Sequence, residues 1–276
     1  MSTTTVSPGP ITAVTFTAPD LDEVRDLYAE FLDYRVVTER EVSADQAAAW
    51  ETPAVCGRAM LELAPAVGDG FFFRVIQARQ ADYTPFASYG WNAAELIVRD
   101  VDALAERLAG SPFQIVGEPQ DLSFSTDIRA MQILGPGSEL LYLTQFKKAV
   151  PGLDVPQARC DVDRTFIVIL GGPSMDDLQA FYADRFGLPR AAVMESRVKG
   201  MSAAFGLSPE HGYPIAALPL AGQSLIELDE MPTQAGPRAV VDGELPPGIS
   251  IVSFAAGENR CLRGPAGEIL ELVPGR

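Results

Sequence analysis

Histidine is nearly absent from this chain, since His211 is the only one in 276 residues. A site that needs two or more imidazoles, such as a 2-His-1-carboxylate iron centre, is therefore excluded. The three cysteines lie far apart and form no Cys-x-x-Cys pair, so neither a disulfide framework nor a thiolate metal site is predicted. We expect Cys56, Cys160 and Cys261 to be small buried hydrophobic residues.

Basic side chains are also scarce, because 21 Lys and Arg stand against 37 Asp and Glu and leave a net charge of −16. This charge repels phosphate groups, so we expect neither nucleic acid nor a membrane surface as a partner. Two interpretations of the acidic field stay open. It is either a solvated surface that keeps the protein soluble or an attraction for a cationic ligand.

Long apolar runs are missing as well. The apolar run at 166–170 is much shorter than the roughly 20 residues that a bilayer-spanning helix needs. The first ten residues have no basic start and no apolar stretch, so no secretory signal is predicted. We therefore expect a cytoplasmic protein.

The chain does contain an internal repeat. Residues 11–17 alternate like a strand, and Asp20 is placed to cap a helix whose apolar side chains fall on one face. Strand-like segments follow at 34–42, 57–64 and 71–78. One strand, one helix and three strands thus define the first unit.

The same order returns in the second half of the chain at the level of side chains. Leu27-Tyr-Ala-Glu30 matches Phe181-Tyr-Ala-Asp184, and Ser174 takes the cap position. Gly135-Pro-Gly-Ser-Glu139 matches Gly264-Pro-Ala-Gly-Glu268 ahead of a final strand. These matches predict four units.

The second and fourth units are read from their first strands. The second unit opens with a strand at 92–98 and a helix capped by Asp100. The fourth opens at 249–254 and passes almost directly to its last strands, so its helix is predicted to be missing.

The four units, the hydrophobic-Tyr-x-acid stretch of the first helix and the Gly-Pro-x-Gly-Glu ending resemble the vicinal oxygen chelate superfamily. Its members include glyoxalase I, extradiol dioxygenases, and fosfomycin and bleomycin resistance proteins. The resemblance implies an α+β fold of tandem βαβββ modules, paired into two open-barrel domains. Because 147–156 is rich in turn formers, we expect one pair at 1–148, a linker at 149–162 and the other pair at 163–276.

The resemblance also implies four ligand positions in each barrel, on the first and last strands of its units. They fall on Ala13, Arg74, Ala93 and Tyr142 in the N-terminal half, and on Ile167, Glu227, Ile251 and Glu271 in the C-terminal half. Alanine and isoleucine offer no lone pair to a cation, so we expect no metal and no other cofactor. Loose Mg²⁺ or Ca²⁺ binding by the two glutamates is the open alternative.

Glu227 and Glu271 carry the favoured catalytic hypothesis. Two carboxyls in one apolar barrel would share a proton, because each charge raises the pKa of the other group, and such pairs perform acid/base chemistry. His211, in a turn-rich loop between the second and third strands of the third unit, is the other catalytic candidate. The alternative for all three is an ordinary solvated side chain.

Four further residues are candidates for binding a ligand. Arg74 and Tyr142 would hold an oxygen anion, unless the arginine reaches solvent and the tyrosine is core. Strand alternation puts Trp91 and Glu95 on the face of Ala93, where the indole would form a flat apolar wall unless it too is core.

The sequence thus predicts a metal-independent lyase or isomerase for a small, largely apolar oxygenated molecule of aromatic or polyketide-like character. Which barrel is active stays open. Two alternatives remain, a protein that binds a drug or metabolite unchanged and a degenerate scaffold whose barrels are filled by side chains. A homodimer is compatible with each.

Overall fold

The computed structural model describes residues 7–68, 70–79, 82–122, 125–150 and 154–275. The first unit comprises β1 (Ile11–Ala18), α1 (Leu21–Leu32), β2 (Tyr34–Glu41), α2 (Ala44–Ala49), the 3-10 turn η1 (Pro53–Val55), β3 (Ala59–Pro65) and β4 (Phe72–Gln77). The second unit comprises β5 (Gly90–Val98), α3 (Val101–Leu108), β6 (Gln114–Leu122), β7 (Ser125–Leu134) and β8 (Leu140–Phe146).

The second half of the chain repeats this order. The third unit comprises β9 (Val162–Gly172), α4 (Met175–Phe186), β10 (Met194–Arg197), α5 (Lys199–Ala204), β11 (Gly212–Leu220) and β12 (Ser224–Glu230). The fourth comprises β13 (Ile249–Ala256), β14 (Arg260–Arg263) and β15 (Ile269–Pro274), with no helix among its described residues. The predicted α+β class and the missing fourth helix are confirmed.

Helix caps follow the sequence signals closely. Asp20 accepts hydrogen bonds from the backbone N–H groups of Asp22 and Glu23, and Asp100 and Ser174 cap α3 and α4 in the same way. The short helices α2 and α5 were not predicted. No helix in the described part of the chain is long and apolar enough to cross a membrane.

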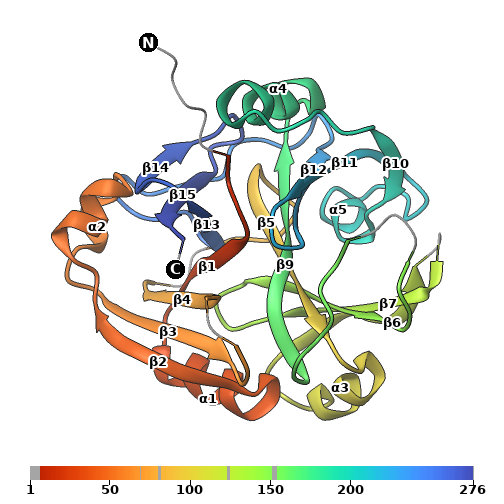
Figure 1. Cartoon of the computed structure of the whole chain (residues 1–276), viewed down its shortest axis with the longest axis horizontal. Helices are drawn as coiled ribbons and strands as arrows, with labels where there is room; N and C mark the ends of the chain where they lie inside the picture. The colour runs from red at the N-terminus through yellow and green to blue at the C-terminus, as the bar shows by residue number, and fades with distance from the viewer. Residues whose placement is uncertain (1–6, 69, 80–81, 123–124, 151–153, 276) are drawn as a thin grey trace.

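The strands form two curled sheets (Figure 1). The seven-stranded sheet has the order β14-β15-β13-β1-β4-β3-β2, and the eight-stranded sheet has the order β10-β11-β12-β9-β5-β8-β7-β6. The first unit therefore pairs with the fourth through β1 and β13, and the second pairs with the third through β5 and β9.

This pairing corrects the expected domain arrangement. A division at 149–162 would join the first unit to the second and the third to the fourth, but each sheet takes one unit from each half of the chain. Local patterns report which segments are strands, whereas the partner of an opening strand depends on long-range packing. Of the expected linker, residues 151–153 lie outside the described residues.

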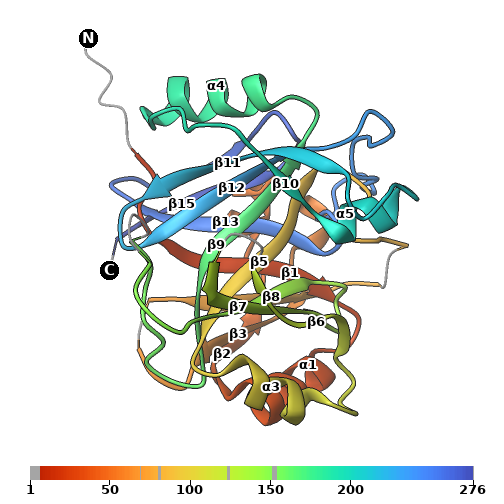
Figure 2. The ribbon, with the colours of Figure 1, turned by 90° about the vertical axis from the view of Figure 1, so that its right-hand side faces the viewer.

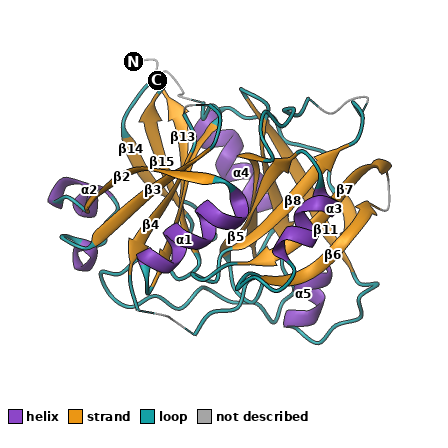
Figure 3. Cartoon of the chain, turned by 90° about the horizontal axis from the view of Figure 1, so that it is seen from below, coloured by secondary structure: helices purple, strands orange, loops and turns teal. Residues whose placement is uncertain are grey.

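The two sheets pack back to back. Their inner faces and the helices α1, α3 and α4 share one hydrophobic core, which contains Phe16 and Phe254 from one sheet and Leu96 and Leu170 from the other. Figure 3 shows the strands of the two sheets in opposite halves of the molecule, and in Figure 2 the eight-stranded sheet lies in front of the seven-stranded sheet. The concave outer faces hold smaller, separate clusters, and the candidate sites lie there.

Two buried tyrosine–glutamate contacts join the sheets. The Tyr28 hydroxyl of α1 donates to Glu139 at 2.9 Å, and the Tyr182 hydroxyl of α4 donates to Glu268 at 3.2 Å. Each glutamate precedes a last strand and also accepts a backbone N–H, from Gly137 or Ala266 respectively. The repeated helix tyrosine and the Gly-Pro-x-x-Glu turn are thus two halves of one structural contact.

The first glycine of each turn is explained by the same contact. A Cβ at Gly135 would lie 1.9 Å from a Glu139 carboxylate oxygen, and one at Gly264 would lie 1.8 Å from Glu268. Any side chain at these positions must therefore displace a buried carboxyl group from its donors.

The first prediction concerns this turn. Gly135→Ala should lower the free energy of unfolding by about 1–3 kcal/mol, because overpacking displaces Glu139. Gly257→Ala is the matched control, since the new Cβ would meet nothing within 4 Å and stability should change by less than about 0.5 kcal/mol. Urea unfolding of both variants measures the difference, and equal stabilities would contradict the steric explanation.

Candidate functional site

Strand register places the candidate ligand positions side by side on the concave face of each sheet. In the seven-stranded sheet Thr15 lies beside Arg74, and Ser253 lies beside Glu271. In the eight-stranded sheet the corresponding pairs are Glu95 with Tyr142 and Ile169 with Glu227. Each of these first-strand residues comes two positions after the one expected from the sequence. The register thus gives Thr15 in place of Ala13, Glu95 in place of Ala93, Ile169 in place of Ile167 and Ser253 in place of Ile251.

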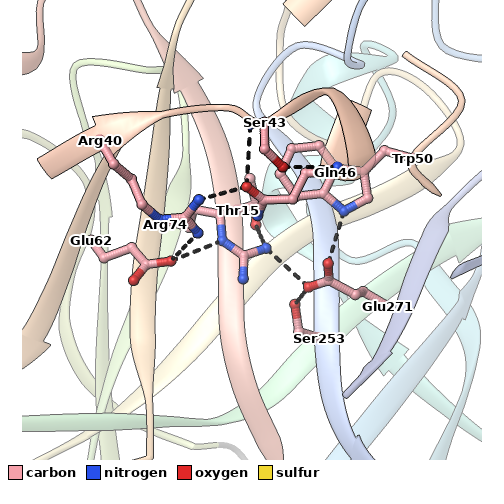
Figure 4. Close-up of polar contacts among 9 residues, drawn as sticks. All are labelled: Thr15, Arg40, Ser43, Gln46, Trp50, Glu62, Arg74, Ser253 and Glu271. Atoms are coloured by element: carbon pink, nitrogen blue, oxygen red, sulfur yellow. Dashed lines mark hydrogen bonds and ion pairs between the residues drawn. The ribbon is translucent and has the colours of Figure 1, made fainter. Parts of the chain in front are cut away.

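The seven-stranded sheet holds a buried ion pair. Arg74 Nη1 lies 2.9 Å from Glu271 Oε2, and the Trp50 indole N–H donates to the other carboxylate oxygen at 2.8 Å (Figure 4). Ser253 also donates to Glu271, and Arg74 Nε donates to Glu62 at 3.4 Å. Every polar partner of this pair therefore comes from the protein itself.

The electrostatics of this pair keep both groups charged. Burial alone would raise the pKa of Glu271, but the charge of Arg74 and the hydrogen bonds from Ser253 and Trp50 hold that pKa below its ordinary value. Burial alone would lower the pKa of Arg74, but Glu271 and Glu62 raise it. Glu271 is thus a fixed carboxylate at neutral pH and does not carry protons there.

Trp50 fills the concave face of the seven-stranded sheet. It follows α2, is 1% exposed, and its ring centroid lies 5.5 Å from the Arg74 guanidinium carbon. Around it packs a cluster of apolar residues: Val42, Ala47, Val55, Met60, Ile76, Leu245, Ile251 and Ile269. This barrel is therefore a packed core around an ion pair, as the scaffold alternative predicts for one barrel.

The eight-stranded sheet presents a different arrangement. Its concave face carries Glu95 of β5, Tyr142 of β8, and Glu227 and Asp229 of β12. Protein surrounds the first three on most sides, yet each keeps part of its surface accessible, whereas Asp229 is 0% exposed. An apolar cluster that includes Ile169, Met201 and Tyr213 packs on the same face against Tyr142. We call this acidic part of the concave face the recess, and Asp229 is its most buried member.

The three carboxyls of this recess titrate far from their ordinary range. Burial raises the pKa of Glu95 to about 8, with a further contribution from the charge of Glu227, and burial raises the pKa of Glu227 to about 7. Burial and the charge of Glu227 raise the pKa of Asp229 well above its usual value. Tyr142 keeps its phenol proton, because burial and the carboxyl groups raise its pKa well above 10.

Two buried oxygens of this face lack partners. Both carboxylate oxygens of Asp229 make no hydrogen bond among the described residues. Buried polar atoms are usually hydrogen-bonded, so these oxygens indicate a place for a bound molecule or for water. Thr165, whose hydroxyl is also unpartnered, lies on the other face, because an irregularity in the pairing of β9 places it beside Leu96 of the core between the sheets.

The structure separates residues that the sequence placed together. Glu227 lies on β12 of the eight-stranded sheet and Glu271 on β15 of the seven-stranded sheet, so they form no carboxylate pair. Arg74 and Tyr142 are separated in the same way, and the arginine is paired with Glu271. The cause is the exchange of units between sheets, which instead joins Arg74 to Glu271 and Glu95 to Glu227.

Two other predicted residues lie away from the recess. Trp91 belongs to the core between the sheets and donates its indole N–H to the Ile269 carbonyl at 2.9 Å. An irregularity in the pairing of β5 between Trp91 and Ala93 breaks the alternation that put them on one face. His211 is exposed just before β11. Its ring packs edge-to-face with the Tyr213 ring, and the two ring centroids are 4.8 Å apart.

Sequence reasoning missed Asp229 and Trp50. Asp229 follows Glu227 by two positions, so strand alternation alone would have placed both carboxyls on one face. Trp50 ends an alanine-rich segment for which no helix was predicted. The capping box that begins at Ser43 is the sequence signal that indicates α2.

Comparison with known proteins bears on the fold. No protein-family model matches the sequence, and no curated protein matches it. Glyoxalase I from Zea mays superimposes with a TM-score of 0.65 at 15% identity, covering 96% of this chain and 92% of that chain. A candidate dioxygenase from Bacillus subtilis subsp. subtilis str. 168 gives 0.65 at 12% identity, covering 98% and 86%. The chain has the vicinal oxygen chelate fold.

The vicinal oxygen chelate fold implies a metal at the first-strand and last-strand positions, and the residues present do not suit one. In the seven-stranded sheet Arg74 brings a positive charge to such a position. In the eight-stranded sheet Ile169 offers no lone pair, and Tyr142 is a protonated phenol. No group of three or more His, Cys, Asp or Glu is arranged to hold a metal ion in the part of the chain that the structure describes.

The second prediction follows from the opposite pKa shifts of the two sheets. Glu95 and Glu227 hold protons in the folded state that the unfolded chain releases above about pH 4.5, so the free energy of unfolding should fall by about 2 kcal/mol or more between about pH 5 and pH 8. Buried Glu139 and Glu268, whose pKa is about 7, contribute in the same direction.

Urea unfolding across this pH range measures the effect. Glu95→Gln should flatten the fall, because the amide has no proton to lose. Glu271→Gln should leave the slope between pH 5 and pH 8 unchanged but reduce stability by about 3 kcal/mol throughout, because Arg74 loses its buried partner. The stabilising effect of Glu271 disappears only as pH falls through its lowered folded pKa. A wild-type stability that rises from pH 5 to pH 8 would contradict the assigned shifts.

Proposed function

We propose that this protein is a metal-independent lyase or isomerase that transfers protons on a small, largely apolar oxygenated molecule bound to the concave face of the eight-stranded sheet. The observation that carries the proposal is the arrangement of Glu95 and Glu227. They lie on neighbouring parts of one recess, with pKa values of about 8 and about 7. Carboxyls tuned to the working pH are suited to proton transfer.

Glu227 is the base in this proposal. Its pKa is raised by burial, whereas the pKa values of Glu95 and Asp229 are raised further by the charge on Glu227 itself. Glu227 therefore ionises first, and its ionisation holds the proton on the other two. Near neutral pH the recess contains one carboxylate beside protonated carboxyl groups.

Glu95 and Tyr142 are the donors. At neutral pH both side chains carry a proton, and they lie side by side on the paired strands β5 and β8. A carbonyl oxygen of the substrate would accept hydrogen bonds from them while Glu227 removes a proton from the neighbouring carbon. The C–H electron pair then forms the enol double bond, and the carbonyl oxygen takes the proton of Glu95.

The enol has two outcomes with the same residues. In an isomerisation Glu227 gives its proton to another carbon while the enol hydroxyl returns its proton to Glu95. In an elimination the enol hydroxyl returns its proton to Glu95 as a new C=C bond forms, and the group on the next carbon leaves with its bonding electrons and takes the proton of Glu227. The apolar part of the substrate would contact Ile167 and Leu225, which lie beside one another near the carboxyl groups and are partly exposed. Because both side chains are apolar, they favour a substrate with an aromatic or aliphatic hydrocarbon portion.

The third prediction tests the base. A panel of small aromatic and aliphatic ketones and hydroxyketones is incubated with the protein in D₂O and followed by proton NMR and mass spectrometry. A substrate should exchange one carbon-bound proton and be converted, and Glu227→Gln should slow both at least about 100-fold. Asp242→Asn, which removes an equal charge from an exposed position, is the control and should match the wild type.

The pH dependence adds an independent readout. Turnover should rise as Glu227 loses its proton near pH 7 and fall as Glu95 loses its proton near pH 8. Full turnover in Glu227→Gln would refute the assigned base. Recovery of an intact, tightly bound panel member without exchange would instead support the alternative of a protein that binds a drug or metabolite unchanged.

A further inference from the structure

The recess of the eight-stranded sheet combines negative charge with apolar surface and holds no counter-charge. Glu95, Glu227 and Asp229 are its carboxyl groups, and no basic side chain is among the charges that shift their pKa values in the described residues. β9 contributes Ile167 and Ile169 to this face, which carry no charge.

The other titratable groups near this face are engaged elsewhere or uncharged. Tyr142 of β8 and Tyr213 of β11 are buried or partly buried phenols, and Tyr213 shares a 3.0 Å hydrogen bond with Ser202. Lys199 of α5 is exposed and donates to Gln120 at 3.2 Å. Arg197 of β10 is paired with Glu210 at 2.6 Å.

The deep end of the recess needs donors. Asp229 is fully buried, and neither of its carboxylate oxygens has a hydrogen-bond partner in the described residues. An ammonium group supplies three N–H donors and no acceptor, which complements a set of acceptor oxygens.

The open end is apolar. Along β12 the side chains that face the recess run from partly exposed Leu225 through Glu227 to buried Asp229, and Leu225 lies beside Ile167 of β9. A molecule with a charged end and a hydrocarbon end would therefore place the charge among the carboxyls and the hydrocarbon toward the mouth.

We propose that the small molecule bound by this recess is an organic cation, a primary ammonium attached to an aromatic or aliphatic group, with the ammonium held by the unpartnered carboxylate oxygens of Asp229, beyond Glu227 and Glu95. This inference rests on the proposed function for the location of the site, and it names the class of substrate. A neutral molecule would offer Asp229 only uncharged donors, which form weaker hydrogen bonds with a carboxylate, and an anionic molecule would add charge of the same sign.

Cation binding is linked to protonation. Below about pH 5 the three carboxyls are neutral and offer an ammonium little more than they offer an alcohol. As pH rises, Glu227 and then Glu95 ionise, so affinity for the cation increases while affinity for a neutral analogue does not. At pH 7 the ammonium bound to Asp229 lowers the pKa of that carboxyl, which releases its proton.

The fourth prediction compares 2-phenylethylammonium with 2-phenylethanol, which differ only at the polar end. Isothermal titration calorimetry of the whole chain at about pH 8 should show at least about tenfold tighter binding of the ammonium. The preference should shrink to less than about twofold at pH 5. At pH 7, buffers of different ionisation enthalpy should reveal proton release with the ammonium and none with the alcohol.

Two variants locate the preference. Asp229→Asn should reduce the preference for the ammonium about tenfold and leave alcohol binding unchanged, whereas Asp242→Asn should behave as the wild type. Equal affinities at pH 8, binding of neither probe, or an undiminished preference in Asp229→Asn would each overturn the proposal. If Asp229→Asn does not fold, the wild-type titrations at pH 7 test the proposal instead, because proton release with the ammonium supports it and the absence of release overturns it. A selective ammonium site without turnover would sustain this inference and refute only the proposed catalysis.

Discussion

The structure depends on one constraint, the antiparallel pairing of strands from opposite halves of the chain. β1 pairs with β13 and β5 with β9, so each curled sheet is completed by a unit that is distant in sequence. The Tyr28–Glu139 and Tyr182–Glu268 contacts then join units that are adjacent in sequence but belong to different sheets. Every unit is thereby bound to one neighbour through strands and to the other through a buried side-chain contact, and the chain cannot separate into two independent halves.

The same constraint gives the two concave faces opposite characters. Exchange of units brings Arg74 opposite Glu271, and the segment around α2 covers this pair with Trp50. In the eight-stranded sheet the exchange brings Glu95 near Glu227 without an arginine, and the equivalent segment around α5 ends in Phe205, which is only partly buried. Equivalent positions of one repeat thus form a closed ion pair in one sheet and an accessible acid cluster in the other.

Much of this arrangement was predictable from the sequence, and the remainder has identifiable causes. The repeat and its caps define strands, helices and the fold, because they depend on local periodicity. Which units pair is not a local property. The predicted pairing of the third unit with the fourth was wrong, and it placed Glu271 in the same barrel as Glu227. Trp91 was misplaced because one irregularity in β5 reverses side-chain alternation, and no residue type marks that position. Asp229 could have been predicted by the same strand alternation that identified Glu95, because it lies two positions after Glu227 on one strand.

Burying three carboxyl groups on one face costs stability at neutral pH, and this cost is the strongest reason to regard the recess as functional. An apolar side chain at Asp229 would remove two unpartnered buried oxygens and would be expected to stabilise the sheet. The Glu271 carboxylate, by contrast, accepts hydrogen bonds from three donors, Trp50, Arg74 and Ser253, that lower its pKa, so it contributes to stability at neutral pH. A bound ammonium would supply the recess with the charge that Arg74 supplies to Glu271, and the ligand would then occupy the role that a protein side chain occupies in the other sheet.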